Sequence, residues 1–387
     1  MSPSGEATGM YFYPRIRKTP YHEATLRYGC KVFTVYNHMF HPIGYTDPLD
    51  EYARLTNDVT LWDVAVERIL EITGPDAFAF TNYLTPRDLS KCAVGECKYV
   101  ILTDQDGGIV NDPVLLRLGK NHFWLALADS DALLWAKGVA SQTGHDVRIR
   151  EPDVSPLQVQ GPKSKPLIRD LFGKKVADIP YYRFVETKLD GMPLVVSRTG
   201  WSGEVGYEVY LQDSSRGDEL WERIMAAGAP YNIAAIAPSE IHRVEAGILN
   251  YQADMTLEIN PYEVGLSWLV DEGKKADYVG KKALARIKKA GVTRKLVGVE
   301  IEGERVPGPS QHNEGRWPVL HRGKVVGYVP DAVYSSRLKK NIGYAMVPIE
   351  HGRLGTKLSV VVPDRGERTL TVVRKPFVDP SKDIPKS

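Results

Sequence analysis

Cysteine is scarce in this chain, with 3 residues among 387. Cys30, Cys92 and Cys97 form an odd set, and neither a C-x-x-C pair nor a His/Cys cluster of metal-binding spacing accompanies them. Such cysteines are typical of buried thiols in a reducing compartment. We therefore expect three buried thiols in a cytoplasmic protein.

Long hydrophobic runs and an excess of either charge are also missing. No stretch approaches 18 uninterrupted apolar residues, and the first residues lack a charged segment that leads into an apolar one. We expect neither a membrane span nor a secretory signal. Lys and Arg total 50 against 48 Asp and Glu, a formal +2, so charge gives no general case for binding nucleic acid or membranes.

Several motifs that carry known chemistry are absent. The sequence contains no G-x-x-x-x-G-K-[ST], no dinucleotide G-x-G-x-x-G after a strand, no H-E-x-x-H and no G-x-S-x-G. Nucleotide hydrolysis, nicotinamide chemistry, zinc peptidase and serine hydrolase activities thus lose their usual support. His38 and His41 lack a third ligand, so we predict no metal site, and the lysines of "KKALARIKKAG" are typical of a solvated helix face.

What is present is the composition of a globular protein, with 43% hydrophobic and 25% charged residues, and a length that suggests two or three domains. A strand, a Gly-Pro turn and an amphipathic helix occur twice, in "ILEITGPDAFAFTNYL" (69–84) and "PLQVQGPKSKPLIRDLF" (156–172). Hairpin signals at Asp106-Gly107 and Asp190-Gly191 favour antiparallel sheets. Each half therefore reads as an α+β module.

Two further helices are predicted before the last quarter of the chain, which has a different secondary-structure pattern. Helices are predicted near "GDELWERIMAAG" and "APSEIHRVEAGI", where acidic residues occupy the first turn. From about residue 294 the chain consists of short strands and turns, which indicates a small barrel or sandwich. We place a domain boundary near residue 290.

Two polar motifs interrupt predicted strands. In "GGIVNDPVLLRL", Pro113 makes Asp112 extended, and a carboxylate inside a buried strand needs a partner, although a turn-forming aspartate bonded to backbone is an alternative. In "RTGWSGEVGYEVYL" (198–211), glycines at 200, 203 and 206 precede a strand that carries Glu208. No basic residue or helix follows these glycines, so the loop favours a flat, nitrogen-rich ring over a phosphate.

The order of these motifs resembles that of the aminomethyltransferase family of the glycine-cleavage T-protein across nearly the whole chain. The resemblance rests on "WDVAVERILEITGPDAFAFTNYLTPRDLS", "GGIVNDP", "RTGWSGEVGYEVYL", "RVEAGILNYQADMTLEINPYEVGLSWLV", "YVGKKAL" and "NIGYAMV". The opening third, with "RKTPYHEATLRYGCKVFTVYNHM" and "DEYARLTNDVTLWDVA", is similar to the dimethylsulfoniopropionate demethylase branch.

The resemblance implies a three-domain cloverleaf of the T-protein type, with two α+β modules and a C-terminal β-barrel-like domain. The first two domains are expected to be discontinuous: residues 1–60 with 151–235, and residues 61–150 with 236–290. Residues 291–387 are expected to form the third domain.

The resemblance also implies a tetrahydrofolate site. Asp112, the predicted catalytic residue, and Glu208 are expected to address folate, because carboxylates can accept the N–H groups of a pterin edge. Tyr99 on the preceding strand, Trp201, and Tyr207 or Tyr210 are expected to contact the ring. Arg243 matches the arginine near the glutamyl tail in T-proteins.

The branch implies a small sulfonium, dimethylsulfoniopropionate, as the methyl donor and 5-methyl-tetrahydrofolate as the product. Aromatic faces attract such a cation, and the candidates are Tyr36, Tyr181, Tyr182 and Trp201, with ordinary core packing as the alternative for each. Tyr181 and Tyr182 stand where the demethylases carry phenylalanines, so another donor stays open.

Other functions fit the same resemblance. One alternative is a folate-dependent demethylase of an aromatic methyl ether or a methylated amine. Another is the aminomethyltransferase of glycine cleavage, although "NDP" replaces the paired aspartates of T-proteins. A non-enzymatic folate-binding role is less well supported, because the K-G-C-Y-x-G-Q-E motif of such relatives is missing. The expected partners are tetrahydrofolate and a small methyl donor, and a homodimer is left open.

Overall fold

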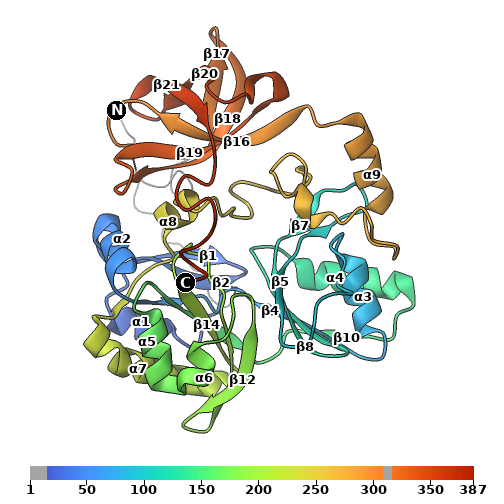
Figure 1. Ribbon diagram of the computed structural model, residues 1–387, viewed down its shortest axis with the longest axis vertical. Helices are drawn as coiled ribbons and strands as arrows, with labels where there is room; N and C mark the ends of the chain where they lie inside the picture. Colours follow the sequence, from blue (N-terminus) through green and yellow to red (C-terminus); the bar gives the residue numbers. More distant parts are fainter. Residues whose placement is uncertain (1–14, 308–315) are drawn as a thin grey trace.

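The structure is a computed structural model that describes residues 15–307 and 316–387. Its strands form three main bodies, a six-stranded sheet, a five-stranded sheet and a six-stranded closed barrel (Figure 1). We call the two sheets with their helices the first and second lobes. Antiparallel pairing predominates throughout, which confirms the predicted α+β class and the C-terminal barrel.

The first lobe contains the six-stranded sheet, in the order β12-β13-β14-β11-β3-β15, where the β3–β15 pair is parallel. A two-stranded hairpin, β1–β2, lies beside it. The strands are β1 (Val32–Tyr36), β2 (Met39–Gly44), β3 (Thr60–Asp63), β11 (Ser155–Gln160), β12 (Phe184–Leu189), β13 (Met192–Ser197), β14 (Gly206–Leu211) and β15 (Ala234–Ala235). The helices are α1 (His22–Arg27), α2 (Pro48–Asn57), α5 (Ser164–Phe172), α6 (Lys174–Ala177) and α7 (Gly217–Gly228), with short 3-10 turns η1 (Ser214–Arg216) and η2 (Ala229–Tyr231).

The second lobe contains the five-stranded sheet, in the order β10-β4-β9-β8-β5, and a small β6–β7 hairpin. Its strands are β4 (Ile69–Thr73), β5 (Cys97–Tyr99), β6 (Leu102–Thr103), β7 (Ile109–Asn111), β8 (Val114–Gly119), β9 (His122–Ala126) and β10 (Arg148–Arg150). The helices α3 (Ala77–Leu84) and α4 (Ala132–Thr143) pack on this sheet.

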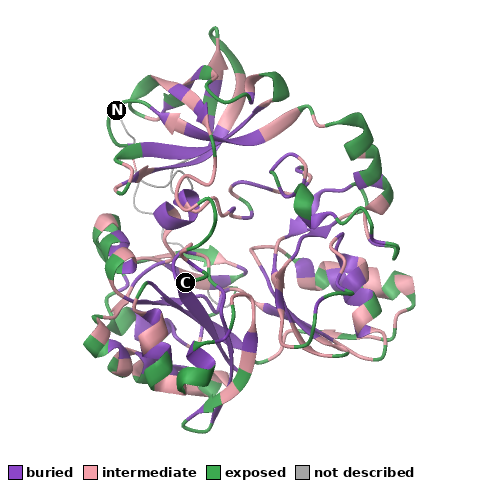
Figure 2. Cartoon of the chain, viewed as in Figure 1, coloured by how far each residue is buried: buried purple, intermediate pink, exposed green. Residues whose placement is uncertain are grey.

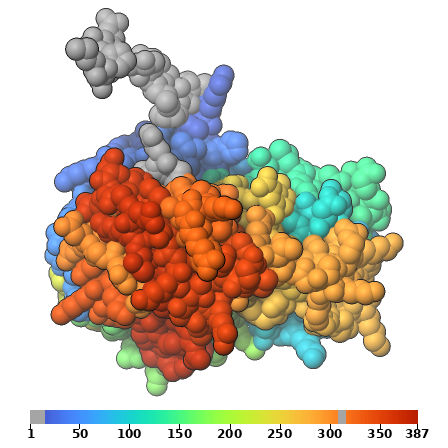
Figure 3. Space-filling view, turned by 90° about the horizontal axis from the view of Figure 1, so that it is seen from above, coloured from blue at the N-terminus to red at the C-terminus, as the bar shows by residue number. Residues whose placement is uncertain are grey.

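The barrel follows two helices and, when the molecule is seen from above, lies mainly over the first lobe (Figure 3). The connecting elements are α8 (Glu240–Glu245), the 3-10 turn η3 (Ser267–Leu269) and α9 (Lys281–Ala290). The helices predicted near Gly217 and Pro238 are α7 and α8, so both predictions are confirmed. The barrel elements are β16 (Arg294–Ile301), β17 (Trp317–His321), β18 (Lys324–Ser335), β19 (Lys340–Pro348), η5 (Ile349–His351), β20 (Lys357–Val362) and β21 (Gly366–Val373).

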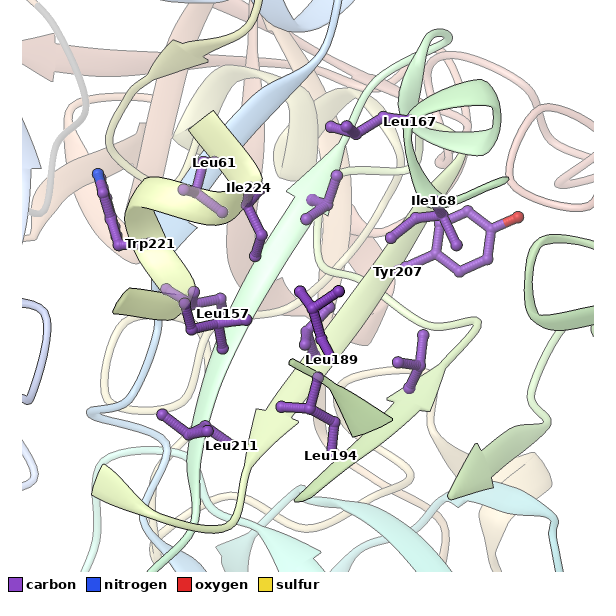
Figure 4. Close-up of a cluster of buried hydrophobic side chains, with 14 of the residues drawn as sticks. Leu61, Leu157, Leu167, Ile168, Leu189, Leu194, Tyr207, Leu211, Trp221 and Ile224 are labelled. Atoms are coloured by element: carbon purple, nitrogen blue, oxygen red, sulfur yellow. The ribbon is translucent and has the colours of Figure 1, made fainter. Parts of the chain in front are cut away.

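The two-residue alternation of β14 decides what each of its side chains meets. Tyr207, Val209 and Leu211 belong to the core cluster that packs beneath α5 and α7 (Figure 4). Because successive strand residues point to opposite faces, Glu208 and Tyr210 point away from these helices. The central strands β3, β11 and β14 are buried along their whole length, whereas outer strands such as β12 are mixed in colour in Figure 2. Strand β14 therefore carries apolar packing on one face and polar chemistry on the other.

The two Gly-Pro repeats have the predicted strand-turn-helix form. Gly74 joins β4 to α3 with φ +122°, and Gly161 joins β11 to α5 with φ +118°. A Cβ atom would lie 2.6 Å from the carbonyl oxygen of Asp146 at the first turn and 2.6 Å from that of Asp58 at the second. Both turns thus require glycine for the same two reasons, the backbone conformation and the close approach of another chain segment.

The chain enters and leaves the first lobe more than once. Strand β3 pairs with β11, and the segment that follows it builds the second lobe before the chain returns at residue 155. The expected domain limits stay a prediction, and residues 1–14 of the expected first domain lie outside the described residues.

Two further expectations concern cysteine and membranes. Cys30, Cys92 and Cys97 are all buried and free, as predicted for thiols. Within residues 15–307 and 316–387, no helix has the length and apolar character needed to cross a bilayer.

We expect Gly161→Ala to destabilise the protein by about 1 to 3 kcal/mol, because the new Cβ would meet the Asp58 carbonyl at a positive φ. Gly138→Ala in α4 is the matched control, since nothing lies within 4 Å of its Cβ position and alanine favours helix. Calorimetric melting of both variants measures the difference. A Gly161→Ala protein that melts with the wild type would contradict this account of the turn.

Candidate functional site

A cavity of about 770 Å³ lies among the lobes, the segment after α8 and the segment after β21. Its size is that of an ordinary small-molecule site. Both lobes supply predicted residues to its wall, whereas Tyr210 and Arg243 are not part of the lining. The predicted residues that the structure brings together here are Tyr36, Tyr99, Asp112, Tyr181, Tyr182, Trp201 and Glu208.

Asp112 lies where the chain passes from β7 to β8. The Tyr99 hydroxyl, on the neighbouring β5, donates a hydrogen bond of 2.9 Å to Asp112 Oδ2, so the carboxylate has the partner that its burial requires. Asn111 fixes the end of β7 by donating to the Ala128 carbonyl at 2.9 Å. Burial raises the pKa of Asp112 to about 7, although the Tyr99 hydrogen bond opposes this. Asp112 is therefore a carboxyl group that can exchange a proton near neutral pH.

Glu208 is held by neutral donors. Its Oε1 accepts from Gln158 Nε2 at 2.8 Å, and its Oε2 accepts from Thr199 Oγ1 at 2.5 Å and from the Tyr210 hydroxyl at 2.7 Å. The register explains the first contact, because Gln158 of β11 pairs directly with Glu208. Burial raises the pKa of Glu208 despite these bonds. Tyr210 thus does not line the cavity itself, and its hydroxyl holds the Glu208 carboxylate, which does.

The glycines of the 200–206 loop serve packing within the protein. A Cβ on Gly200 or Gly206 would lie 2.3 or 2.2 Å from the side chain of Gln160, and one on Gly203 would lie 2.5 Å from the Cβ of Ala246. The loop therefore lies flat against Gln160 and α8. This packing leaves Trp201 on the cavity wall.

Tyr181 and Tyr182 lie between the two lobes. Their rings meet edge to face with centroids 4.8 Å apart. Tyr182 has φ +61°, an uncommon conformation for a bulky residue, and hydrogen bonds of its backbone to Arg198 (3.0 Å) and Cys97 (2.8 Å) hold it there. The strained residue thus sits where first-lobe and second-lobe backbones meet.

Arg243 is fully buried and its guanidinium is bound to three carboxylates. It contacts Glu240 at 2.5 Å, Asp254 at 2.6 Å and Asp331 of β18. The guanidinium carbon also lies 5.6 Å from the centroid of the Trp201 ring, so Arg243 supports the cavity wall from behind. Its expected contact with a glutamyl tail stays a prediction.

Several residues of the wall escaped sequence reasoning. Glu67 lies in the turn between β3 and β4, and an ionisable residue inside "LWDVAVERILEI" was a signal for it. Lys375 follows β21, where nothing distinguishes it from other lysines, and burial lowers its pKa to about 8. The basic and aromatic additions besides Lys375 are His41, Trp62, Arg87, Lys98, Tyr251, Trp268 and Lys382.

Comparisons with known proteins identify the family. Residues 21–274 match the GCVT N-terminal domain, and residues 294–379 match the glycine cleavage T-protein C-terminal barrel domain. A dimethylsulfoniopropionate demethylase of Ruegeria pomeroyi is 41% identical over 358 residues, 92% of this chain and 96% of that protein. An aminomethyltransferase of Symbiobacterium thermophilum is 30% identical, with 94% and 97% of the two chains covered.

The fold comparison agrees with these matches. The crystal structure of the glycine cleavage system aminomethyltransferase T from Bartonella henselae superimposes with a TM-score of 0.83 at 23% identity, covering 94% of this chain and 98% of that chain. The predicted T-protein type of fold is therefore confirmed. The chain belongs to the aminomethyltransferase family of the glycine-cleavage T-protein. As a member of this family it is an enzyme that uses tetrahydrofolate.

We expect Asp112→Asn to stabilise the protein more at pH 8 than at pH 5. The folded pKa of about 7 lies above the unfolded value of about 3.9, so the wild type loses stability as pH rises between these values, and asparagine removes that loss. Thermal melting at both pH values measures the effect. Asp106→Asn, in the exposed β6–β7 turn, controls for loss of one carboxylate, and equal shifts at both pH values for Asp112→Asn would contradict the prediction.

Proposed function

We propose that the protein transfers a methyl group from a small sulfonium, dimethylsulfoniopropionate, to tetrahydrofolate, leaving methylthiopropionate and 5-methyl-tetrahydrofolate. The 41% identity to the Ruegeria pomeroyi demethylase over nearly the full length of both chains carries this proposal. The cavity supports it, because aromatic rings and carboxylates that suit a cation share one wall.

A sulfonium needs little chemical help from the protein. Its leaving group departs as a neutral thioether, so no nucleophilic side chain is required. Bound tetrahydrofolate would supply the ring amine that accepts the methyl group. The protein then has to align the reactants and exclude water, and the walls of the cavity between the lobes are the surfaces available for this.

We assign the folate contacts to Glu208 and Asp112, with Tyr99 and Tyr210 holding these carboxylates in place. Glu208 Oε1 has one protein donor and retains acceptor capacity for a pterin N–H. Asp112 Oδ1 is the oxygen that Tyr99 leaves open, and with a pKa of about 7 it suits acceptance of a proton released in the transfer. Trp201 borders both reactants, and Arg243 supports it.

The sulfonium is assigned to the aromatic part of the wall. Tyr36 comes from β1, and Tyr181 and Tyr182 come from the junction of the lobes. One cation over one ring contributes about 0.5 to 2 kcal/mol, so recognition needs several rings together. The four predicted aromatic residues all line the cavity, which supports this assignment.

The first test is a panel assay. The protein is mixed with tetrahydrofolate and, separately, dimethylsulfoniopropionate, glycine betaine, dimethylglycine, vanillate and an aminomethyl-lipoyl carrier, and 5-methyl-tetrahydrofolate or the methylene form is quantified by chromatography. We expect 5-methyl-tetrahydrofolate with the sulfonium. Transfer only from vanillate, a methylated amine or the lipoyl carrier would contradict the sulfonium, and folate binding without any turnover would favour an accessory role.

The second test separates the two parts of the site by a reciprocal pair of variants. Trp201→Ala should raise the KM for the sulfonium by roughly 2- to 30-fold, more than the KM for tetrahydrofolate, because a cation loses an aromatic face. Glu208→Gln should raise the KM for tetrahydrofolate more than the KM for the sulfonium. It should cost roughly 1.5 to 3 kcal/mol of folate binding, since a charged acceptor is lost. Steady-state kinetics and folate titration calorimetry measure both. Equal losses in Trp201→Ala would place Trp201 on the pterin.

A further inference from the structure

The Glu67 carboxylate differs from the other acids around it. Its main chain is fixed in the turn between β3 and β4, where the Glu67 amide donates to the Val64 carbonyl at 2.9 Å, and its side chain lines the cavity. Within the described residues, no group donates a hydrogen bond or forms an ion pair to this carboxylate.

Nearby acids outside the cavity wall do have charged partners. Arg68, the next residue, is turned to Glu151 at 2.5 Å, and Glu71 of β4 is bound to Arg150 at 2.5 Å. Arg68 and Arg150 are thus already paired, and the basic residues of the cavity wall form no ion pair with Glu67 in the part of the chain that the structure describes. The Glu67 carboxylate therefore faces the cavity.

The charges that Glu67 faces make this arrangement costly. Glu208 of β14 and Asp112 between β7 and β8 are the charged groups whose fields act on it, and Tyr36 of β1 and His41 of β2 share the wall. Burial and the two carboxylates raise the pKa of Glu67 well above its usual range, and burial lowers the pKa of His41 to about 4, so His41 adds no positive charge. Without a ligand, the half-buried Glu67 carboxyl group therefore favours its protonated form, and a cation that enters the cavity favours the ionised form.

We propose that Glu67 is the counter-charge that makes the donor site select onium compounds, whose methyl groups sit on a positively charged atom, over neutral methyl donors of the same shape. This inference rests on the proposed function for the kind of donor. A sulfonium has no N–H or O–H to donate, so a carboxylate recognises it through charge alone, alongside the aromatic faces. A neutral methyl ether in the same place would carry no charge to attract the ionised form of Glu67, so it would gain nothing from this carboxylate.

The test compares binding of two shape-matched ligands without folate. In 4-methylpentanoate a C–H unit replaces the sulfonium sulfur of dimethylsulfoniopropionate, so the carboxylate and the branching are kept and the positive charge is lost. Titration calorimetry of the wild type should give at least about tenfold tighter binding of the sulfonium. Glu67→Gln should lose most of this preference through weaker sulfonium binding, with binding of 4-methylpentanoate unchanged.

Two controls accompany this variant. Glu67→Asp keeps the charge and should keep a preference for the cation, and Glu302→Gln removes an exposed carboxylate in the barrel and should behave as wild type. Titration in buffers of different ionisation enthalpy gives a second readout. A cation that drives ionisation of Glu67 releases a proton on binding, and Glu67→Gln should release less.

The outcomes separate this inference from the proposed function. A second matched pair, 3-(trimethylammonio)propionate and 4,4-dimethylpentanoate, asks the same question of an ammonium donor. A preference for either cation that Glu67→Gln abolishes supports the role of Glu67 even when the sulfonium is not demethylated. A folded Glu67→Gln protein that keeps the wild-type preference overturns it, whatever the panel assay shows, as does a wild type that prefers neither cation.

Discussion

The buried cluster around Arg243 is the interaction on which the arrangement of the molecule depends. One guanidinium binds Glu240 at the start of α8, Asp254 in the segment after α8 and Asp331 in β18 of the barrel. Replacing Arg243 by a neutral residue would leave these buried carboxylates without its positive charge. This is far more costly than losing a surface ion pair. The barrel, α8 and the connecting segment are therefore fixed to one another, and Trp201 rests against the result.

The cavity shows the opposite electrostatic design. Glu67, Asp112 and Glu208 line its wall, and where they have partners these are neutral hydroxyl or amide groups. Such an arrangement lowers the stability of the unliganded protein, because each carboxylate is more readily ionised in water than here. The Arg243 cluster fixes the barrel to α8 and the connecting segment, whereas Glu67, Asp112 and Glu208 form no ion pair within the described part of the chain. Functional sites commonly retain strain of this kind because the surrounding structure over-determines it.

Local sequence rules predicted most of the architecture and part of the site. The alternation of β14 and the Gly-Pro turns at Gly74 and Gly161 need only neighbouring residues to be understood, and both have the predicted form. The resemblance selected seven residues that meet on one cavity, but it could not show that Tyr210 lies behind Glu208, because both point to the same face of the strand. Glu67 had a local signal, an ionisable residue in an apolar run, but Lys375 reaches the same cavity only through chain closure over hundreds of residues, which no local pattern encodes.

The position of β3 has a consequence for how the chain acquires its structure. This strand pairs with β11 across almost a hundred residues, and with β15 across still more. The second lobe needs only residues 69–150 for its five strands. During synthesis its sheet can therefore form before β11 and β15, the strands that pair with β3, have been synthesised. Contacts so distant in sequence slow folding, and they leave the apolar edge of β3 exposed to other chains until residue 160 has emerged. Residues 69–150, not the residues that precede them, are thus the part of the chain able to mature first.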